Sequence, residues 1–329
     1  MPFTDTGTHD EALEIIKCFL MRGLADIQRE RHETEMKILE HGPYKLNNTA
    51  ICIGKFDGLH SGHRMLLNSI QESSDLTKVL FTFHFSDSGH IYSSEEKRYL
   101  AEKLGIEVYI DCPFDEELSH MMPQTFLEEI LIRQCGAKVI SVGEDFRFGY
   151  KRQGDVAFLM KNSSVYGYEL KVFPKKKMFD EPVSSTKIRE ELEKGSIEMV
   201  NQLLGDPYFI YGEVCRGNQI GRTIQMPTVN QLPEQEKLLP PYGVYASRIH
   251  TQYGEYIGVT NVGVKPTIPG ENRVGVETYI MDFDREIYGE MICVELFAFL
   301  RGERRFSGLD TLKIQLEEDK KNAYLFFRQ

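Results

Sequence analysis

One stretch, residues 50–70, constrains the fold of this chain more than any other. It opens with an apolar, β-prone run at 50–53, turns through the glycine-containing residues 54–58, and continues into a segment of helix length with apolar residues at helical spacing. Glycines let backbone amides approach a phosphate closely, and the start of a helix offers that anion unpaired N–H groups and the positive end of its dipole. The stretch therefore predicts a strand, a phosphate-binding turn and a helix.

Two histidines stand three residues apart at the expected start of this helix. His60 and His63 are thereby placed so that both can face one phosphate. A strand, a glycine and a helix form a common pattern, whereas G-x-F-D-G-x-H-x-G-H is far more specific. The alternative interpretation is a core turn followed by two surface histidines. The pattern consists of Gly54, Phe56, Asp57, Gly58, His60, Gly62 and His63.

These residues resemble the HxGH-type nucleotidyltransferase motif of bacterial bifunctional riboflavin kinase/FMN adenylyltransferases, also called FAD synthetases. The resemblance implies an α/β doubly wound parallel sheet followed by a small antiparallel β-barrel with a C-terminal helix. It implies phosphorylation of riboflavin to FMN and adenylylation of FMN to FAD, with ATP and Mg²⁺ as cofactors. In the second reaction His60 and His63 would stabilise developing charge, and the other five residues of the motif would bind ATP.

Composition limits the partners and the compartment. The chain has 329 residues, 41% of them hydrophobic, and a net charge of −11. This length suggests two domains, and the sequence has no broad basic stripe that would favour nucleic acid or an anionic membrane. We expect small-molecule substrates, and the oligomeric state stays open, with a homo-oligomer among the options. Six cysteines without a CxxC pair, no apolar run of membrane-spanning length and an acidic N-terminus predict a cytoplasmic protein.

The chain divides into three predicted parts. Residues 1–45 form an expected helical extension that the family resemblance does not cover, with candidate helices at 11–24 and 26–40. It could bind a partner or regulate the enzyme, but packing against its own chain is favoured. A nucleotidyltransferase-like domain is expected over 46–200 and a riboflavin kinase domain over 206–329, with the boundary near 197–207.

Strands and helices are expected to alternate after the first motif. Such alternation predicts a parallel, doubly wound sheet that binds its ligands beyond the carboxyl ends of the strands. The expected strands are 78–85, 108–112 and 138–142, and the expected helices are 95–104 and 125–134.

The last of these strands leads into a second signature, VGEDFRFGYKRQGD at 142–155. It closely resembles the corresponding family segment. The resemblance implies that Asp145 binds nucleotide and that Phe146 and Arg147 contact flavin. Taken alone, Asp145 and Arg147 could also form a salt bridge within a loop.

A third signature, VSSTKIR at 183–189, precedes another expected helix. Ser184, Ser185 and Thr186 form a good N-cap cluster. Arg189 follows a turn later, where its guanidinium could join the capping amides around a pyrophosphate. In the resembling family this segment closes over the triphosphate. The basic triplet 175–177 is interpreted as a solvated loop.

The second half of the chain is rich in short, alternating, turn-bounded segments. Their spacing predicts a small antiparallel barrel, and a helix is expected to pack on it. The expected strands are 208–215, 243–249, 255–262, 274–280 and 291–300, and the expected helix is 310–327.

This half resembles the riboflavin kinase module, most clearly at MPTVN, residues 226–230. The hydroxyl of Thr228 suits Mg²⁺ or a phosphate oxygen, and Asn230 can complete that shell. Glu277 would be the general base that takes the proton of the riboflavin 5′-hydroxyl. Taken singly, these residues are ordinary turn and strand residues. The resemblance also implies that Gly217, Gly221, Arg222 and Asn230 bind ATP and that Arg301 binds flavin.

Two departures from the family pattern leave alternatives open. The loop at 85–87 after the second strand is shortened, and Gln225 stands where the family usually has glycine. One alternative is a riboflavin kinase with an impaired adenylyltransferase domain. Another is a non-catalytic flavin-binding regulator that uses the N-terminal extension as its contact surface.

Overall fold

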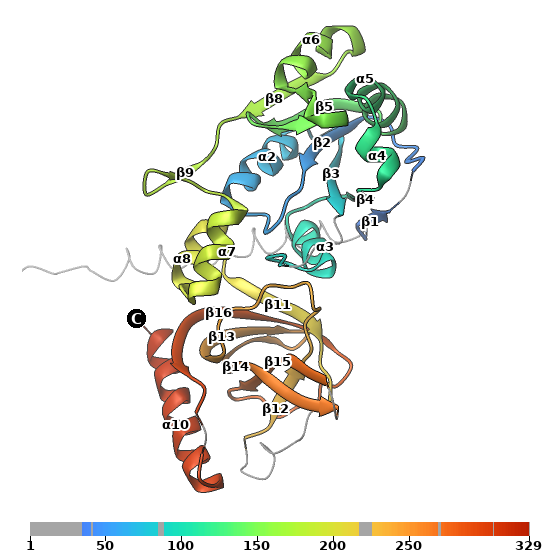
Figure 1. Cartoon of the computed structure of the whole chain (residues 1–329). Coiled ribbons are helices and arrows are strands. Elements are labelled where there is room, and N and C mark those ends of the chain that lie inside the picture. The colour runs from blue at the N-terminus through green and yellow to red at the C-terminus, as the bar shows by residue number, and fades with distance from the viewer. Residues whose placement is uncertain are drawn as a thin grey trace, which may run out of the picture.

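The computed structural model describes residues 35–40, 42–84, 89–216, 226–268, 271–304 and 306–328. An α/β module is followed by an antiparallel β module, and both are visible in Figure 1. The expected helix at 11–24, the altered loop at 85–87 and Gln225 lie outside the described residues. Within the described part of the chain, no helix combines the length and the apolar character needed to cross a membrane.

The first module is built on a six-stranded parallel sheet, as its alternating pattern predicted. The strand order is β1-β4-β3-β2-β5-β8, and every neighbouring pair is parallel. This order is that of a doubly wound sheet with β1 added at one edge. The strands are β1 (Lys37–Leu39), β2 (Thr49–Gly54), β3 (Thr77–His84), β4 (Val108–Pro113), β5 (Ala137–Gly143) and β8 (Glu169–Phe173).

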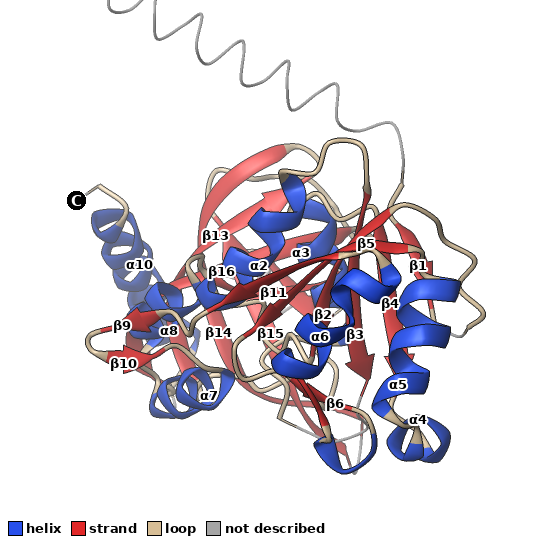
Figure 2. Ribbon diagram, turned by 90° about the horizontal axis from the view of Figure 1, so that it is seen from above, coloured by secondary structure: helices blue, strands red, loops and turns tan. Residues whose placement is uncertain are grey.

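Helices cover both faces of this sheet, as Figure 2 shows. Ala50 and Cys52 of β2 pack in one core with α2 (Ser61–Gln71) and α3 (Ser94–Lys103). Ile51 and Ile53 pack in a second core with η1 (Phe126–Gln134) and α6 (Val156–Tyr166). Because successive residues of a strand point to opposite faces, a strand covered on both sides is apolar throughout. The apolar run at 50–53 has this origin.

Two expectations for helices are wrong in part. Residues 37–39 were expected within a helix, but they form β1, because their backbone pairs with Val108–Ile110 at the open edge of the sheet. The expected helix at 125–134 begins as a single turn, α5 (Pro123–Thr125), and continues as a π-helix over Phe126–Gln134. The sequence patterns also missed α4 (Glu116–His120), α6 and β8.

The second module is the predicted antiparallel barrel. Its strands lie in the order β11-β16-β13-β14-β15-β12. The two edges meet where the Cys215 amide donates to the Asn230 carbonyl (2.7 Å) and the Gln231 side chain donates to the Gly212 carbonyl (2.9 Å). The strands are β11 (Tyr208–Glu213), β12 (Thr228–Gln231), β13 (Gly243–Thr251), β14 (Gly254–Ile268), β15 (Glu271–Ile280) and β16 (Met291–Gly302).

The C-terminal helix α10 (Leu309–Phe326) lies along the side of the barrel (Figure 1). The guanidinium of Arg301 on β16 holds the Asp319 carboxylate of this helix through several hydrogen bonds, with Nη2 to Oδ2 at 2.6 Å. Asp319 is only 1% exposed. Removing one partner would leave the other charge buried without compensation, so this pair fixes the helix on the barrel.

Helices α7 (Ser185–Lys194) and α8 (Ile197–Leu204) connect the modules, and α8 packs on β11 and β16. Gly205 ends α8 in the left-handed conformation. Leu66 of α2 and Ile210 of β11 belong to one buried cluster, so the two modules share a hydrophobic core. The remaining short elements are β6 (Arg147–Phe148), η2 (Tyr150–Arg152), β7 (Gly154–Asp155), β9 (Lys177–Met178) and β10 (Glu181–Pro182).

Candidate active site

A cavity of about 830 Å³ lies at the carboxyl ends of β2 and β5. From these neighbouring strands the chain winds in opposite directions, towards β3 on one side and β8 on the other. In open α/β sheets ligands bind in the crevice at such a switch point. The three N-terminal signatures meet there. The predicted site residues that line the cavity are Gly54, Phe56, His60, Gly62, His63, Asp145, Phe146, Arg147, Ser184, Ser185, Thr186 and Arg189.

The two histidines of the first signature are stacked at the start of α2. Their ring centroids are 3.6 Å apart, and Phe56 and His63 make a T-shaped contact. His60 is the N-cap, because its Nδ1 accepts a hydrogen bond from the backbone amide of His63 (3.3 Å). A Cβ atom on residue 62 would lie 3.2 Å from the His60 ring, so Gly62 allows the ring to pack across the helix end.

Burial keeps both imidazoles neutral near pH 7. Desolvation lowers the pKa of His60 to about 4 and the pKa of His63 well below its usual range. In a neutral imidazole one nitrogen accepts and the other carries the proton. Since Nδ1 of His60 accepts from a backbone amide, its Nε2 carries the proton and can donate to a phosphate oxygen. Nδ1 of His63 has no hydrogen-bond partner among the described residues.

These pKa values predict a pH dependence of stability. Between about pH 6.5 and pH 4 the unfolded chain binds a proton at His60 that the folded, ligand-free chain does not bind, so the free energy of unfolding falls as the pH falls. In H60N the Asn side chain can still cap α2, but it does not titrate. We expect the loss of unfolding free energy between pH 7 and pH 4.5 to be smaller by about 2 kcal/mol in H60N.

Urea unfolding at both pH values measures this difference. H120N is the matched control, because His120 is exposed on α4. An equal loss of stability in H60N and in the wild-type protein would contradict a depressed His60 pKa.

The third signature begins α7, as its N-cap cluster predicted. The Ser184 hydroxyl accepts from the Lys187 amide (3.3 Å) and caps the helix. The Ser185 hydroxyl donates to the Asp57 carbonyl (2.8 Å), and Arg189 Nη2 donates to Asp57 Oδ2 (2.6 Å). The start of α7 is thus fastened to the glycine turn of the first signature. Arg189 and the free amides of the helix end face the same cavity as the two histidines.

Asp57 and Gly58 belong to the first signature but do not line the large cavity. The Asp57 side chain is 3% exposed and supports Arg189, so its predicted contact with ATP stays a prediction. Gly58 has φ +83° and borders a smaller cavity of about 190 Å³ between the modules. The left-handed backbone there suits glycine.

Aromatic side chains form one wall of the large cavity. Phe146 and Phe148 stack with centroids 5.4 Å apart, and Phe83 meets Phe114 edge-on at 6.1 Å. A flat heteroaromatic ring gains both apolar burial and stacking on such a wall. Sequence reasoning missed Phe83 and Phe114. A lone Phe at the end of an apolar strand carries no functional signal without the neighbours that the fold brings to it.

Residues 175 and 176 lie in a loop, and Lys175 is exposed, as predicted, but the prediction missed that this loop borders the cavity. Lys175 and Lys176 line the cavity, and Lys175 Nζ lies 2.8 Å from Asp145 Oδ2. They follow the carboxyl end of β8, which the sequence patterns missed. Recognition of that strand would have placed the triplet at the ligand-binding edge of the sheet.

The second predicted site lies on the barrel. Asn230 on β12 stands opposite Glu277 on β15, and Thr228 is two residues from Asn230 on the same face. The Thr228 hydroxyl donates to Glu277 Oε1 (2.5 Å). The structure therefore brings together the three residues predicted to hold Mg²⁺ and to act as the base. Gly217, Gly221 and Arg222 lie outside the described residues.

Arg301 engages the C-terminal helix through Asp319, as described above. Its predicted contact with flavin stays a prediction, because the guanidinium already has this partner.

Comparison with known proteins finds a matching family for each half of the chain. The FAD synthetase family matches residues 43–187, and the riboflavin kinase family matches residues 204–327. A bifunctional riboflavin kinase/FMN adenylyltransferase of Haemophilus influenzae is 34% identical over 295 residues, 86% of this chain and 95% of that protein. The protein of the same name from Bacillus subtilis is 32% identical, over 85% of this chain and 92% of its own length.

The fold also matches a solved structure. A crystal structure described as a macrolide-efflux protein from Streptococcus pneumoniae has a TM-score of 0.74 and 26% identity, and it covers 88% of this chain and 99% of its own. The two matched families cover most of the chain between them. The chain belongs to the bifunctional riboflavin kinase/FMN adenylyltransferase family.

Proposed function

We propose that this chain makes FAD from riboflavin in two steps. Its barrel phosphorylates riboflavin with ATP, and its α/β module transfers the AMP moiety of a second ATP to the resulting FMN with release of pyrophosphate. The observation that supports this most is the convergence of three separate signatures on one cavity of nucleotide size, lined by aromatic and cationic side chains. The Thr228–Glu277 pair supports the kinase step independently.

In the kinase step Glu277 accepts the proton of the riboflavin 5′-hydroxyl as its oxygen attacks the γ-phosphorus of ATP. The bond from the γ-phosphorus to the bridging oxygen breaks, and ADP leaves. Because the Thr228 hydroxyl donates its hydrogen to Glu277, its lone pairs are turned away and can accept a cation. Glu277 then lies beside both the hydroxyl that it deprotonates and the residue that holds the phosphate end of the nucleotide.

The donor set around Glu277 fits Mg²⁺. Hydroxyl, amide and carboxylate oxygens are the ligands that this ion prefers, and it keeps several waters and phosphate oxygens besides. Thr228 and Asn230 would hold the ion. When bound, Mg²⁺ neutralises charge on the phosphates of ATP.

In the adenylyl step a phosphate oxygen of FMN attacks the α-phosphorus of ATP, and pyrophosphate leaves. No protein nucleophile is needed. The Nε2–H of His60 donates to the charge that develops on the phosphate, while Arg189 and the amides at the start of α7 hold the leaving pyrophosphate. Lys175 and Lys176 add positive charge to the same cavity.

The cellular setting is also a proposal. We place the enzyme in the cytoplasm, supported by Cys52, Cys112, Cys135 and Cys293, which occur as buried free thiols. Burial raises the pKa of each of these thiols and so keeps it protonated. Free cysteines of this kind are typical of reducing compartments. A homo-oligomer is compatible with either step, since the described residues of each site come from one chain.

Isotope transfer tests both reactions in one preparation. The purified protein is incubated with riboflavin, Mg²⁺ and ATP labelled at either the γ- or the α-phosphate. The γ-label should appear in FMN, and the α-label should appear in FAD and never in FMN. Absence of the α-label from flavin, with FMN supplied directly, would contradict the adenylyl step. Absence of the γ-label would contradict the kinase step.

A further inference from the structure

Lys237, in the segment between β12 and β13 of the barrel, is buried at the junction of the two modules. Its ammonium donates to the Ile91 carbonyl (3.3 Å), the Phe209 carbonyl (3.1 Å) and Glu96 Oε2 (2.6 Å). The side chains of Lys237 and Glu96 are 1% and 2% exposed. Desolvating two ions costs several kcal/mol each, and they stay in such a place only when the geometry satisfies both fully.

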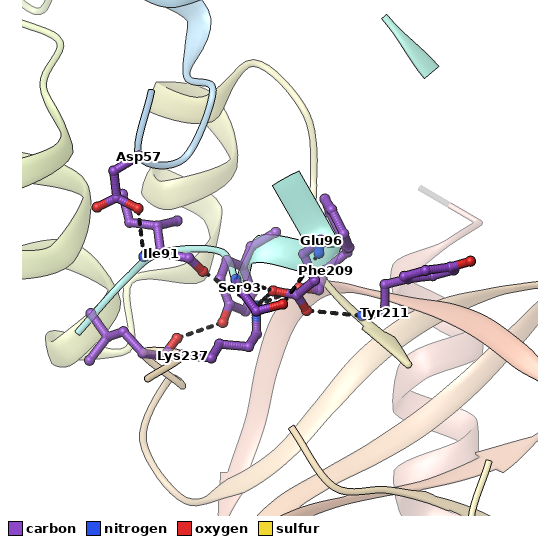
Figure 3. A network of polar contacts seen from close by, with 9 residues as sticks. Asp57, Ile91, Ser93, Glu96, Phe209, Tyr211 and Lys237 are labelled. Atoms are coloured by element: carbon purple, nitrogen blue, oxygen red, sulfur yellow. Dashed lines mark hydrogen bonds and ion pairs between the residues drawn. The ribbon is translucent and has the colours of Figure 1, made fainter. Parts of the chain in front are cut away.

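The carboxylate of Glu96 accepts hydrogen bonds from both modules, as Figure 3 shows. It belongs to the capping box of α3, in which Oε2 accepts from the Ser93 amide (3.0 Å), and its Oε1 accepts from the Tyr211 amide of β11 (3.0 Å). Burial raises the pKa of Glu96 and lowers that of Lys237, and the opposite charge of each partner counters the effect. The pair thus fastens α3 of one module to β11 of the other.

Backbone hydrogen bonds also join the segment around Lys237 to the residues that precede α3. The amides of Gly89 and His90 both donate to the Glu236 carbonyl, and the Leu238 amide donates to the His90 carbonyl (2.7 Å). The segment that follows β3 is therefore held by the barrel on both sides of Lys237.

Ile91 carries this restraint to the adenylyl site. Its carbonyl accepts from Lys237, and its amide donates to Asp57 Oδ1 (3.0 Å). Its side chain packs on the glycine turn, because a Cβ atom on Gly58 would lie 2.9 Å from Ile91 Cδ1. One residue therefore joins the barrel cation to the carboxylate of the first signature (Figure 3).

Asp57 in turn fixes Arg189. Its Oδ1 accepts from Ile91 and its Oδ2 accepts from Arg189 Nη2 (2.6 Å), so the position of one bond sets the direction of the other. Arg189 lines the large cavity, while Asp57 does not. In a buried network of this kind each hydrogen bond polarises and orients the next.

We propose that Lys237 of the riboflavin kinase barrel is a positioning residue for adenylyl transfer, acting through Ile91 and Asp57 on Arg189. The proposal rests on the proposed function of the cavity. Without the ammonium, the Ile91 carbonyl loses its hydrogen bond from the barrel, which leaves the backbone bonds at His90 to hold this segment. The Ile91 backbone can then rotate, which shifts Asp57 and turns Arg189 away from the pyrophosphate. A misplacement of about 1 Å can cost roughly a hundredfold in rate, so we expect a loss of about ten- to a hundredfold in FAD formation.

Two variants of the full chain test this. K237M removes the ammonium but keeps most of the side-chain length. The double variant E96Q/K237M removes both charges together, so that no buried ion is left unpaired and folding is protected. Adenylyl transfer is assayed with FMN and ATP, and the reverse reaction with FAD and pyrophosphate. Riboflavin phosphorylation and thermal unfolding are measured on the same samples.

In both variants we expect a lower kcat for FAD formation and a KM for pyrophosphate raised about tenfold or more, with the KM for FAD and riboflavin kinase turnover within twofold of wild type. K313M is the control, because Lys313 is exposed on α10, and it should match wild type in every assay. Wild-type KM for pyrophosphate in both variants, or a parallel loss of both activities, would overturn the proposal. Absence of FAD formation by the wild-type protein would instead contradict the proposed function.

Discussion

E277Q is expected to slow FMN formation by at least about a hundredfold and to leave FAD formation from supplied FMN unchanged. Gln keeps the size of the side chain and an oxygen that can accept from the Thr228 hydroxyl, so the barrel stays intact. It has no basicity, so the riboflavin 5′-hydroxyl keeps its proton as it attacks. Loss of a general base typically costs about 10²- to 10⁴-fold in rate. The measurement is the initial rate of FMN formation from riboflavin and ATP.

E255Q is the matched control, because Glu255 is an exposed carboxylate on β14 of the same barrel. It should phosphorylate riboflavin at the wild-type rate. Less than a threefold loss in E277Q would show that another group takes the proton.

H60N is expected to produce the opposite result, a loss of FAD formation with riboflavin phosphorylation unchanged. Asn can still cap α2, but it is too short to place a donor where Nε2 of His60 lies. Removing one preorganised donor to developing charge typically costs about 10²- to 10³-fold in kcat. The measurement is pyrophosphate release from FMN and ATP, with H120N as the control.

The two variants together separate the modules. If H60N lowered riboflavin phosphorylation as much as FAD formation, His60 would be supporting the fold rather than the adenylyl step.

Because the neutral imidazole of His60 needs no proton change to donate, wild-type adenylyl transfer should not lose activity through titration of His60 between pH 6 and pH 8.

Much of the fold could be predicted from local pattern. The apolar run at 50–53 predicts a buried strand. The glycines and the two histidines that follow predict the turn and the start of the helix. The three signatures also predicted which residues would line the cavity, because each combines an unusual set of residue types at fixed spacing. Their convergence follows from the doubly wound topology, which places the ends of β2 and β5 together.

What escaped prediction depends on contacts between distant segments. β1 is only three residues long and mostly exposed, so its strand character comes from the open edge of β4 and not from its own composition. Lys176 has the sequence context of a solvated loop, and only its place after β8 brings it into the cavity.

The contacts at the junction between the modules could not be predicted from the sequence either. Glu96 has the sequence context of an ordinary capping residue on a charged helix, and Lys237 that of a surface lysine in a loop. Their burial is a property of the assembled pair of modules, since each completes the other's hydrogen bonds. No local pattern carries that information.

The central claim is that one chain runs both reactions in sequence, and a product time course tests it most directly. The full-length protein is incubated with riboflavin, ATP and Mg²⁺, and the flavins are separated by chromatography at successive times. We predict that FMN appears first and is then converted to FAD. Accumulation of FMN without any FAD, or formation of neither flavin, would contradict the account.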